Sequence, residues 1–162
     1  MALVVEDGTG KADAESYVSV ATFRSWATSR GYLLPAMDAD VEALLRKACD
    51  FIERKSFSGT PLVATQALAF PRSVLDEYGD YESTGIPAKL VAAQELLAME
   101  CMNGPLTSAA RANKYTATKI DQIYLKYADS SAGSGDIYFP AIDDLLAPWC
   151  SGGRAKIVTV RA

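Results

Sequence analysis

Neighbouring carboxylates are the residues of this chain best suited to chemistry, because general acid–base catalysis needs two acids held in different environments. Such groups occur within residues 76–82 and at Asp143 and Asp144. Both stretches have turn character, which favours solvated loop acids. The 162 residues include no histidine, which excludes Ser-His-Asp and Cys-His nucleophiles and histidine-ligated metals.

Other reactive residue types are too sparse to form a site. Three cysteines are far apart and odd in number, without a metal spacing or a disulfide framework, and this favours a reducing compartment: Cys49, Cys101 and Cys150. Asp38 and Asp40 lack the remainder of a calcium loop, and Gly8 and Gly10 lack the following helix of a phosphate-binding loop. We therefore expect no catalytic residue, no metal, no cofactor and no enzymatic activity.

The charge of the chain argues against tight binding to nucleic acid. Sixteen basic residues stand against twenty acidic ones, for a net charge of −4, with −5 over residues 1–85 and +1 over residues 86–162. A nucleic-acid footprint is normally a strongly basic stripe. The most apolar stretch, residues 86–102, is interrupted by charged and polar residues, which excludes a membrane span there.

Three amphipathic patterns must supply the framework, and they predict a mainly α fold. Helices are predicted over residues 19–30, with Ser19 as the N-cap and Gly31 after the end, and over residues 40–55. A third is predicted over residues 87–103, opened by Pro87 and rich in alanine. We expect a bundle of three to four helices with a small β-hairpin and extended N- and C-terminal arms.

The hairpin is predicted from a stretch rich in Tyr, Thr and Ile, with residues 115–120 paired to residues 123–127 around a turn at 121–122. Its aromatic and basic residues could form a stacking platform for nucleic acid. Alternatively, its tyrosines pack on the bundle while its lysines protect an exposed edge. The candidate functional residues of the hairpin are Lys114, Lys119, Tyr124 and Lys126.

The long connection over residues 56–85 lacks strong periodicity, so we expect both a short helix near residues 65–69 and a functional loop. It contains the run QALAFPR and then an acidic stretch with tyrosines. The candidates for contacts between subunits are Gln66, Phe70, Pro71, Arg72, Tyr78 and Tyr81.

The C-terminal segment follows a Gly/Ser-rich stretch at residues 130–135 and is dense in large apolar groups. It either folds back onto the domain or forms an arm laid into a partner. We predict a helical domain over residues 1–135 and a docking arm over residues 136–162. The docking candidates are Phe139, Pro140, Ile142, Leu145, Leu146, Pro148 and Trp149.

Several separated motifs resemble one family over nearly the whole chain. In order they read ADAESYVSVA, LLRKACDFIERK, QALAFPR, IPAKLVAAQELLA and FPAIDDLLAPW. This series resembles small phage and prophage proteins encoded beside the major capsid protein and often labelled DnaT-like single-stranded DNA-binding proteins. The family's Asp-Tyr block stands here as DFIERK, and Phe70 replaces the family's Trp.

The resemblance implies two functions. One is a head-to-tail adaptor, typically a ring of twelve copies that joins the portal to the tail or tail-completion protein and lets DNA slide through without specific binding. In such a ring the hairpin candidates would face the lumen or the tail. The other is a single-stranded DNA-binding protein of replication. Because net −4 suits a conduit better than a DNA binder, we favour the adaptor, assembled in the host cytoplasm and resident in the neck of the virion, without membrane contact.

Overall fold

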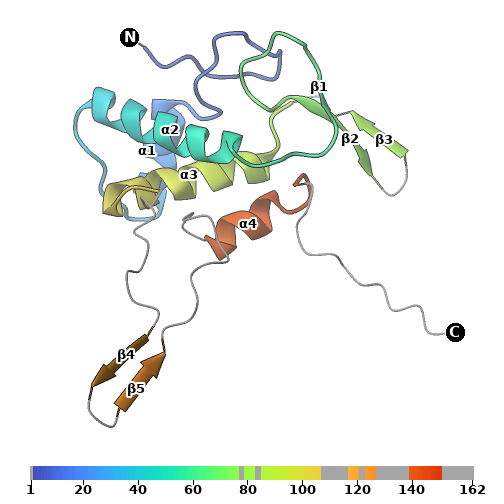
Figure 1. The fold of residues 1–162 in the computed structure, drawn as a ribbon. Helices are drawn as coiled ribbons and strands as arrows, with labels where there is room; N and C mark the ends of the chain where they lie inside the picture. Colours follow the sequence, from blue (N-terminus) through green and yellow to red (C-terminus); the bar gives the residue numbers. More distant parts are fainter. Residues whose placement is uncertain are drawn as a thin grey trace, which may run out of the picture.

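The computed structural model describes residues 2–76, 79–82, 85–106, 117–120, 123–126 and 139–150, with strand residues 74–82 and 117–126 described by backbone only. Helices α2 and α3 lie side by side at the centre of the body (Figure 1). The helices are α1 (Val20–Ser29), α2 (Asp38–Glu53), α3 (Ala88–Asn103) and α4 (Pro140–Leu146). The strands are β1 (Thr60–Pro61), β2 (Arg72–Asp76), β3 (Gly79–Glu82), β4 (Ala117–Ile120) and β5 (Ile123–Lys126). The predicted mainly helical fold with a small hairpin is confirmed.

The helix ends follow from local chemistry. Ser19 caps α1, its Oγ accepting a hydrogen bond from the Thr22 amide at 3.1 Å. Gly31 follows α1 with φ +74°, a conformation that costs glycine little. Helix α2 begins and ends two residues earlier than predicted, which places Asp38 and Asp40 in its first turn, where acids favour the helix dipole.

Gln94, at the middle of α3, is a fully buried polar residue that joins three segments. Its amide nitrogen donates to the Leu45 carbonyl at 3.0 Å and to Ser16 Oγ at 2.8 Å. Its amide oxygen accepts from the Tyr17 amide at 2.9 Å. Since a buried amide costs stability unless it is hydrogen-bonded, this residue fixes the N-terminal segment against α2 and α3.

The N-terminal residues pack onto the domain rather than extending as an arm. Val5 pairs with Ser16, and the Glu6 carboxylate accepts hydrogen bonds from the amides of Gly8, Gly10 and Lys11 at 2.8–2.9 Å. Gly8 and Gly10 have φ of +95° and +79°. The turn signal seen in the sequence is therefore a loop closed around a buried carboxylate.

The predicted short helix near residues 65–69 is wrong. These residues form turns, and the connection instead builds a sheet of order β1–β2–β3, with Thr60 opposite Ser73 and Ser73 opposite Glu82. Gln66 explains the difference: its side chain accepts from the Val63 amide and donates to the carbonyls of Leu68 and Pro71. A side-chain amide thus satisfies backbone groups that a helix would otherwise pair.

The second hairpin confirms the predicted pairing where the structure describes it. Strands β4 and β5 are antiparallel, with Ala117 opposite Lys126 and Ile120 opposite Ile123. The predicted turn residues and the outer residues 115, 116 and 127 lie outside the described residues.

Residues 139–150 of the C-terminal segment pack against the body, while the predicted division at residue 135 stays a prediction. Lys55 Nζ lies 2.7 Å from Asp143 Oδ1, and the Ser58 amide donates to the Trp149 carbonyl at 2.7 Å. Phe57 and Cys150 form an antiparallel bridge. Of the two alternatives that the sequence left open, the structure shows the fold-back for these residues; residues 151–162 lie outside the described part.

Candidate functional site

A buried polar network holds the QALAFPR run against α2. The Tyr17 hydroxyl donates to Glu53 Oε1 at 2.5 Å and accepts from the Phe70 amide at 3.2 Å, while the Ala69 amide donates to Glu53 Oε2 at 2.8 Å. Burial raises the pKa of Tyr17, and the Glu53 charge adds to that rise. Burial also raises the pKa of Glu53, although the hydrogen bonds from Tyr17 and Ala69 oppose it.

Arg72 anchors the same run from the other side. It is 6% exposed, and its guanidinium donates to the carbonyls of Phe57, Gly59 and Ala69 at 2.9–3.3 Å. Its carbon Cζ lies 5.6 and 5.7 Å from the ring centroids of Phe57 and Phe70. Within the described residues its Nε has no hydrogen-bond partner, and burial lowers its pKa. Arg72 therefore serves the fold rather than an exposed surface.

This geometry places four of the candidates for contacts between subunits in the chain's own fold, and their role between subunits stays a prediction. Gln66, Phe70, Pro71 and Arg72 are tied into the chain's own interior, because Phe70 is fully buried in contact with Tyr17, Phe57 and Trp149. Tyr78 lies outside the described residues, and Tyr81 lies on β3 opposite Val74. The family motif thus marks a structural loop.

The candidate docking residues also contact the chain's own core. Ile142 and Leu146 are buried in it, Phe139, Leu145 and Trp149 pack against it, and Pro140 and Pro148 are exposed. The ring of Phe139 meets that of Phe51 edge-on at 5.7 Å. These apolar side chains bury surface within one chain, and their docking on a partner stays a prediction.

The structure gives only the strand pairing of the hairpin candidates. Lys119 on β4 lies opposite Tyr124 on β5, and Lys126 lies opposite Ala117. Lys114 lies outside the described residues. Their role toward the lumen, the tail or DNA stays a prediction.

Sequence reasoning missed an exposed apolar surface in the loop between α1 and α2, here called the loop patch and made of Tyr32, Leu33 and Met37. Their exposed fractions are 45%, 88% and 66%. Tyr32 stacks on Trp26 with ring centroids 5.6 Å apart, and Arg30 lies 4.5 Å above the Trp26 ring. The sequence could have indicated this surface through the apolar run that follows Gly31 in a short loop. An exposed apolar run is typical of an interaction surface.

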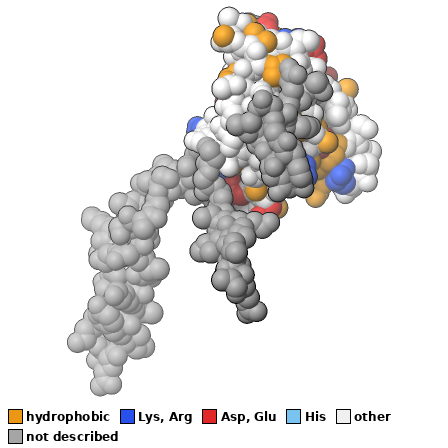
Figure 2. Space-filling view, turned by 90° about the vertical axis from the view of Figure 1, so that its right-hand side faces the viewer, with side chains coloured by type: hydrophobic (Ala, Val, Ile, Leu, Met, Phe, Trp, Pro, Cys, Tyr) orange, Lys and Arg blue, Asp and Glu red, His pale blue; other side chains and the backbone are white. Residues whose placement is uncertain are grey.

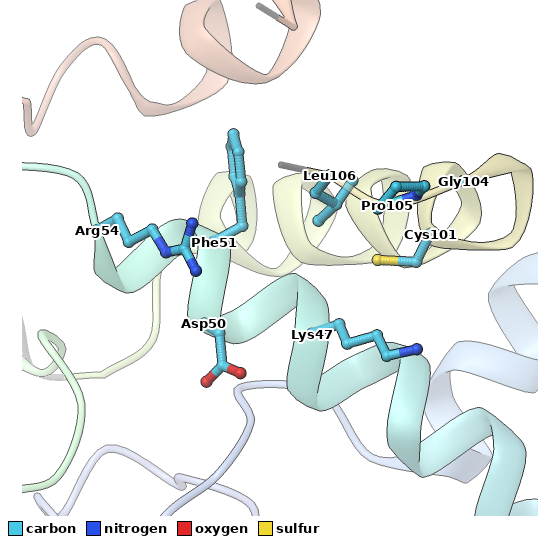
Figure 3. Close-up of a pocket in the computed structure, with 8 residues that line it drawn as sticks. All are labelled: Lys47, Asp50, Phe51, Arg54, Cys101, Gly104, Pro105 and Leu106. Atoms are coloured by element: carbon cyan, nitrogen blue, oxygen red, sulfur yellow. The ribbon is translucent and has the colours of Figure 1, made fainter. Parts of the chain in front are cut away.

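A second surface is a hollow of about 520 Å³ between α2 and the end of α3, here called the helix hollow (Figure 3). Its lining residues are Lys47, Asp50, Phe51, Arg54, Cys101, Gly104, Pro105 and Leu106. Phe51, Cys101 and Leu106 form an apolar floor, whereas Lys47 and Arg54 are exposed at the rim and form no ion pair with another described residue. In Figure 3 the Asp50 carboxylate points away from Cys101 and Leu106. The hollow is therefore apolar inside, and its edge, with Lys47, Arg54 and Asp50, has a net positive charge.

Reactive groups are not concentrated in the described part of the chain. There, no three Cys, Asp or Glu side chains gather as a metal site. Burial raises the pKa of Cys49 and of Cys150, and raises that of Cys101 to about 11, so these thiols are poor nucleophiles at neutral pH. Among the described helices, none is long and apolar enough to cross a membrane.

Charge is mixed on the face of the described residues that Figure 2 shows. On the face shown in Figure 2, acidic and basic side chains are scattered among apolar ones, without a basic stripe over the described residues. The fold and surfaces thus define a small helical domain, held together by buried polar groups, with an apolar patch and a cationic-rimmed hollow.

The whole chain, residues 1–162, matches the family described as "Putative DnaT-like ssDNA binding protein", and the chain belongs to that family. Neither the comparison with curated proteins nor that with solved structures gives a match. The resemblance to the family labelled DnaT-like is confirmed, whereas the identity as a phage connector stays a prediction. The family description agrees with single-stranded DNA binding, the alternative we had placed second, better than with the connector role.

Proposed function

We propose that the chain is a structural adaptor that associates with copies of itself in a ring between the portal and the tail of a phage. The observation that carries the proposal is the loop patch, in which three large apolar side chains stand exposed within six residues. A monomer gains nothing from such a surface, whereas a protein–protein contact gains the free energy of burying it.

Charge supports a role beside DNA rather than on it. A net charge of −4 and the mixed surface of Figure 2 give phosphates little to bind. As an adaptor the chain would act in the neck of the virion after assembly in the host cytoplasm. Its partners would be its own copies, the portal and the tail or tail-completion protein, and it would carry out no catalysis.

Single-stranded DNA binding is the second candidate, and the family description supports it more directly than it supports the adaptor. A specific geometry also favours it. Phe23, Trp26 and Tyr32 form a stack with centroids 5.6–5.8 Å apart, and Arg30 lies beside it. A base could extend that stack over the exposed side of Tyr32, since stacking on aromatic rings is the usual basis of single-strand binding.

Two measurements on the purified full-length chain separate the candidates. Sedimentation and electron microscopy, with and without portal, should show rings if it is an adaptor. A gel shift with an unstructured oligonucleotide at about 0.15 M salt should show negligible binding. Tight, salt-dependent binding by a chain that forms no ring, alone or with portal, would replace the adaptor with the DNA-binding function.

A further inference from the structure

Two surfaces of the described chain complement each other in polarity and in charge. The loop patch is apolar and is followed at once by Asp38 and Asp40 in the first turn of α2. Asp40 is exposed and forms no ion pair with a described residue, while Asp38 pairs with Arg24 but keeps a side chain that is 72% exposed. The helix hollow is apolar inside and carries two cations, Lys47 and Arg54, and one acid, Asp50, at its rim, so the rim has a net positive charge.

We infer that the loop patch of one copy fills the helix hollow of the next copy. Leu33 and Met37 would cover the apolar floor, and Asp40 would face Lys47 and Arg54. The inference rests on the proposed ring and names the contact that builds it. The hollow's volume of about 520 Å³ is within the range of sites that enclose small ligands, so it has room for more than one side chain.

A loop patch that fills the hollow must come from a second copy, because the patch cannot reach the hollow of its own chain. Asp38 and Lys47 lie on one continuous helix, and nine residues of helix separate them by about 14 Å. Residues 127–138, outside the described part, carry only the acids Asp129 and Asp136 and are the competing occupant, which would give no ladder in the cross-linking test below. Two other segments outside the described residues are poor occupants on charge. Every charged residue within residues 107–116 and within residues 151–162 is basic, so Lys47 and Arg54 would repel them.

The geometry of such a contact agrees with a ring. Patch and hollow are different surfaces, so each copy uses one toward each neighbour, and a contact of this heterologous kind forms a closed ring or an open filament rather than a simple dimer. The charges favour one register, because the attraction between Asp40 and the pair Lys47 and Arg54 is lost when the patch docks in another position.

Cross-linking tests the contact directly, because Cys101 lines the hollow. We expect Met37→Cys, treated with a disulfide-forming oxidant, to give a ladder of covalent multimers on a non-reducing gel. Adding Cys101→Ser should abolish the ladder. Leu62→Cys, which places a thiol at another exposed apolar position, is the matched control and should give none. A Met37→Cys ladder that persists without Cys101, or no ladder at all, overturns the inference.

Charge exchange supplies a second, reversible test. Asp40→Lys alone and Lys47→Glu alone should each abolish assembly, and an equimolar mixture of the two variants should restore it, because each junction then joins opposite charges. Asp144→Lys and Lys89→Glu are controls of equal charge change at other exposed positions and should assemble normally. If rings form on portal while every one of these variants assembles, the proposed function stands and the contact is overturned. If the Cys101-dependent ladder forms but no ring appears on portal, the contact stands and the adaptor function fails.

Discussion

Leu146→Ala should strongly destabilise the folded chain, because residues 139–150 belong to the core. Leu146 is fully buried at the end of α4, within the same apolar cluster as the residues of α2 and α3. Replacing a buried Leu by Ala removes its transfer free energy and leaves a cavity, at a cost of about 2–5 kcal/mol. Small domains are stable by only about 5–15 kcal/mol, so this single change removes a large share of the total.

Urea unfolding followed by far-ultraviolet circular dichroism measures the effect. With a dependence of about 1–3 kcal/mol per molar urea, we expect the unfolding midpoint to fall by roughly 1–2 M. The matched control is Leu62→Ala, since Leu62 is 41% exposed and its truncation leaves little cavity. Deleting residues 136–162 should cost more than Leu146→Ala, because Ile142 and the Lys55–Asp143 pair are lost as well.

The result that would refute this reasoning is a Leu146→Ala chain that unfolds at the same urea concentration as the unchanged protein. Residues 139–150 would then contribute nothing to folding, and the free docking arm that the sequence suggested would return. A large effect from both Leu146→Ala and Leu62→Ala would instead mean that the assay reports general sensitivity to lost apolar volume.

Three further predictions test the polar framework. Gln94→Leu should cost about 1–3 kcal/mol in urea unfolding, because it leaves the buried Tyr17 amide without its acceptor; an unchanged midpoint would contradict this role. Arg72→Lys should lower the melting temperature although charge is kept, since one ammonium group cannot reproduce the planar fork that contacts three carbonyls; equal melting would show that charge alone matters. Burial raises the pKa of Glu53 above its ordinary 4.5, so the folded chain keeps this proton to higher pH than the unfolded chain does. The stability due to protonated Glu53 is therefore lost as pH rises from about 4.5 through the folded pKa. Urea unfolding of the wild type and of Glu53→Gln should show a difference in stability that changes with pH over this range. A difference that stays constant with pH would mean that the pKa of Glu53 is the same in the folded and unfolded chains.

Local sequence signals were sufficient to predict α1, α2, α3 and the second hairpin. Ser19 and Gly31 mark the ends of α1 by chemistry that needs no distant partner, and Pro87 marks the start of α3 in the same way. The pairing of β4 with β5 likewise follows from residues within ten positions of each other. Such elements can be predicted because their determinants are close in the sequence.

The rest depends on contacts between distant residues. Gln66 reads as an ordinary polar residue in a helical run, and only its bonds to Val63, Leu68 and Pro71 show why a helix does not form. Composition left the fold-back and the free arm equally open for residues 139–150, and the contacts with Lys55 and Ser58, about ninety positions away, decide between them. No periodicity in one segment encodes such a choice.

The two candidate functions compete for the same residues, and this makes them separable. The exposed side of Tyr32 is where a base would extend the aromatic stack, and Tyr32 also belongs to the loop patch that a second copy would cover. A ligand that binds only one of two states shifts the equilibrium toward that state. Single-stranded DNA that stacks on Tyr32 must therefore dissociate assembled rings, whereas DNA that only passes through the lumen must leave them intact. Sedimentation of assembled protein with increasing oligonucleotide thus distinguishes a DNA binder whose assembly is opposed by its ligand from a conduit that is indifferent to it.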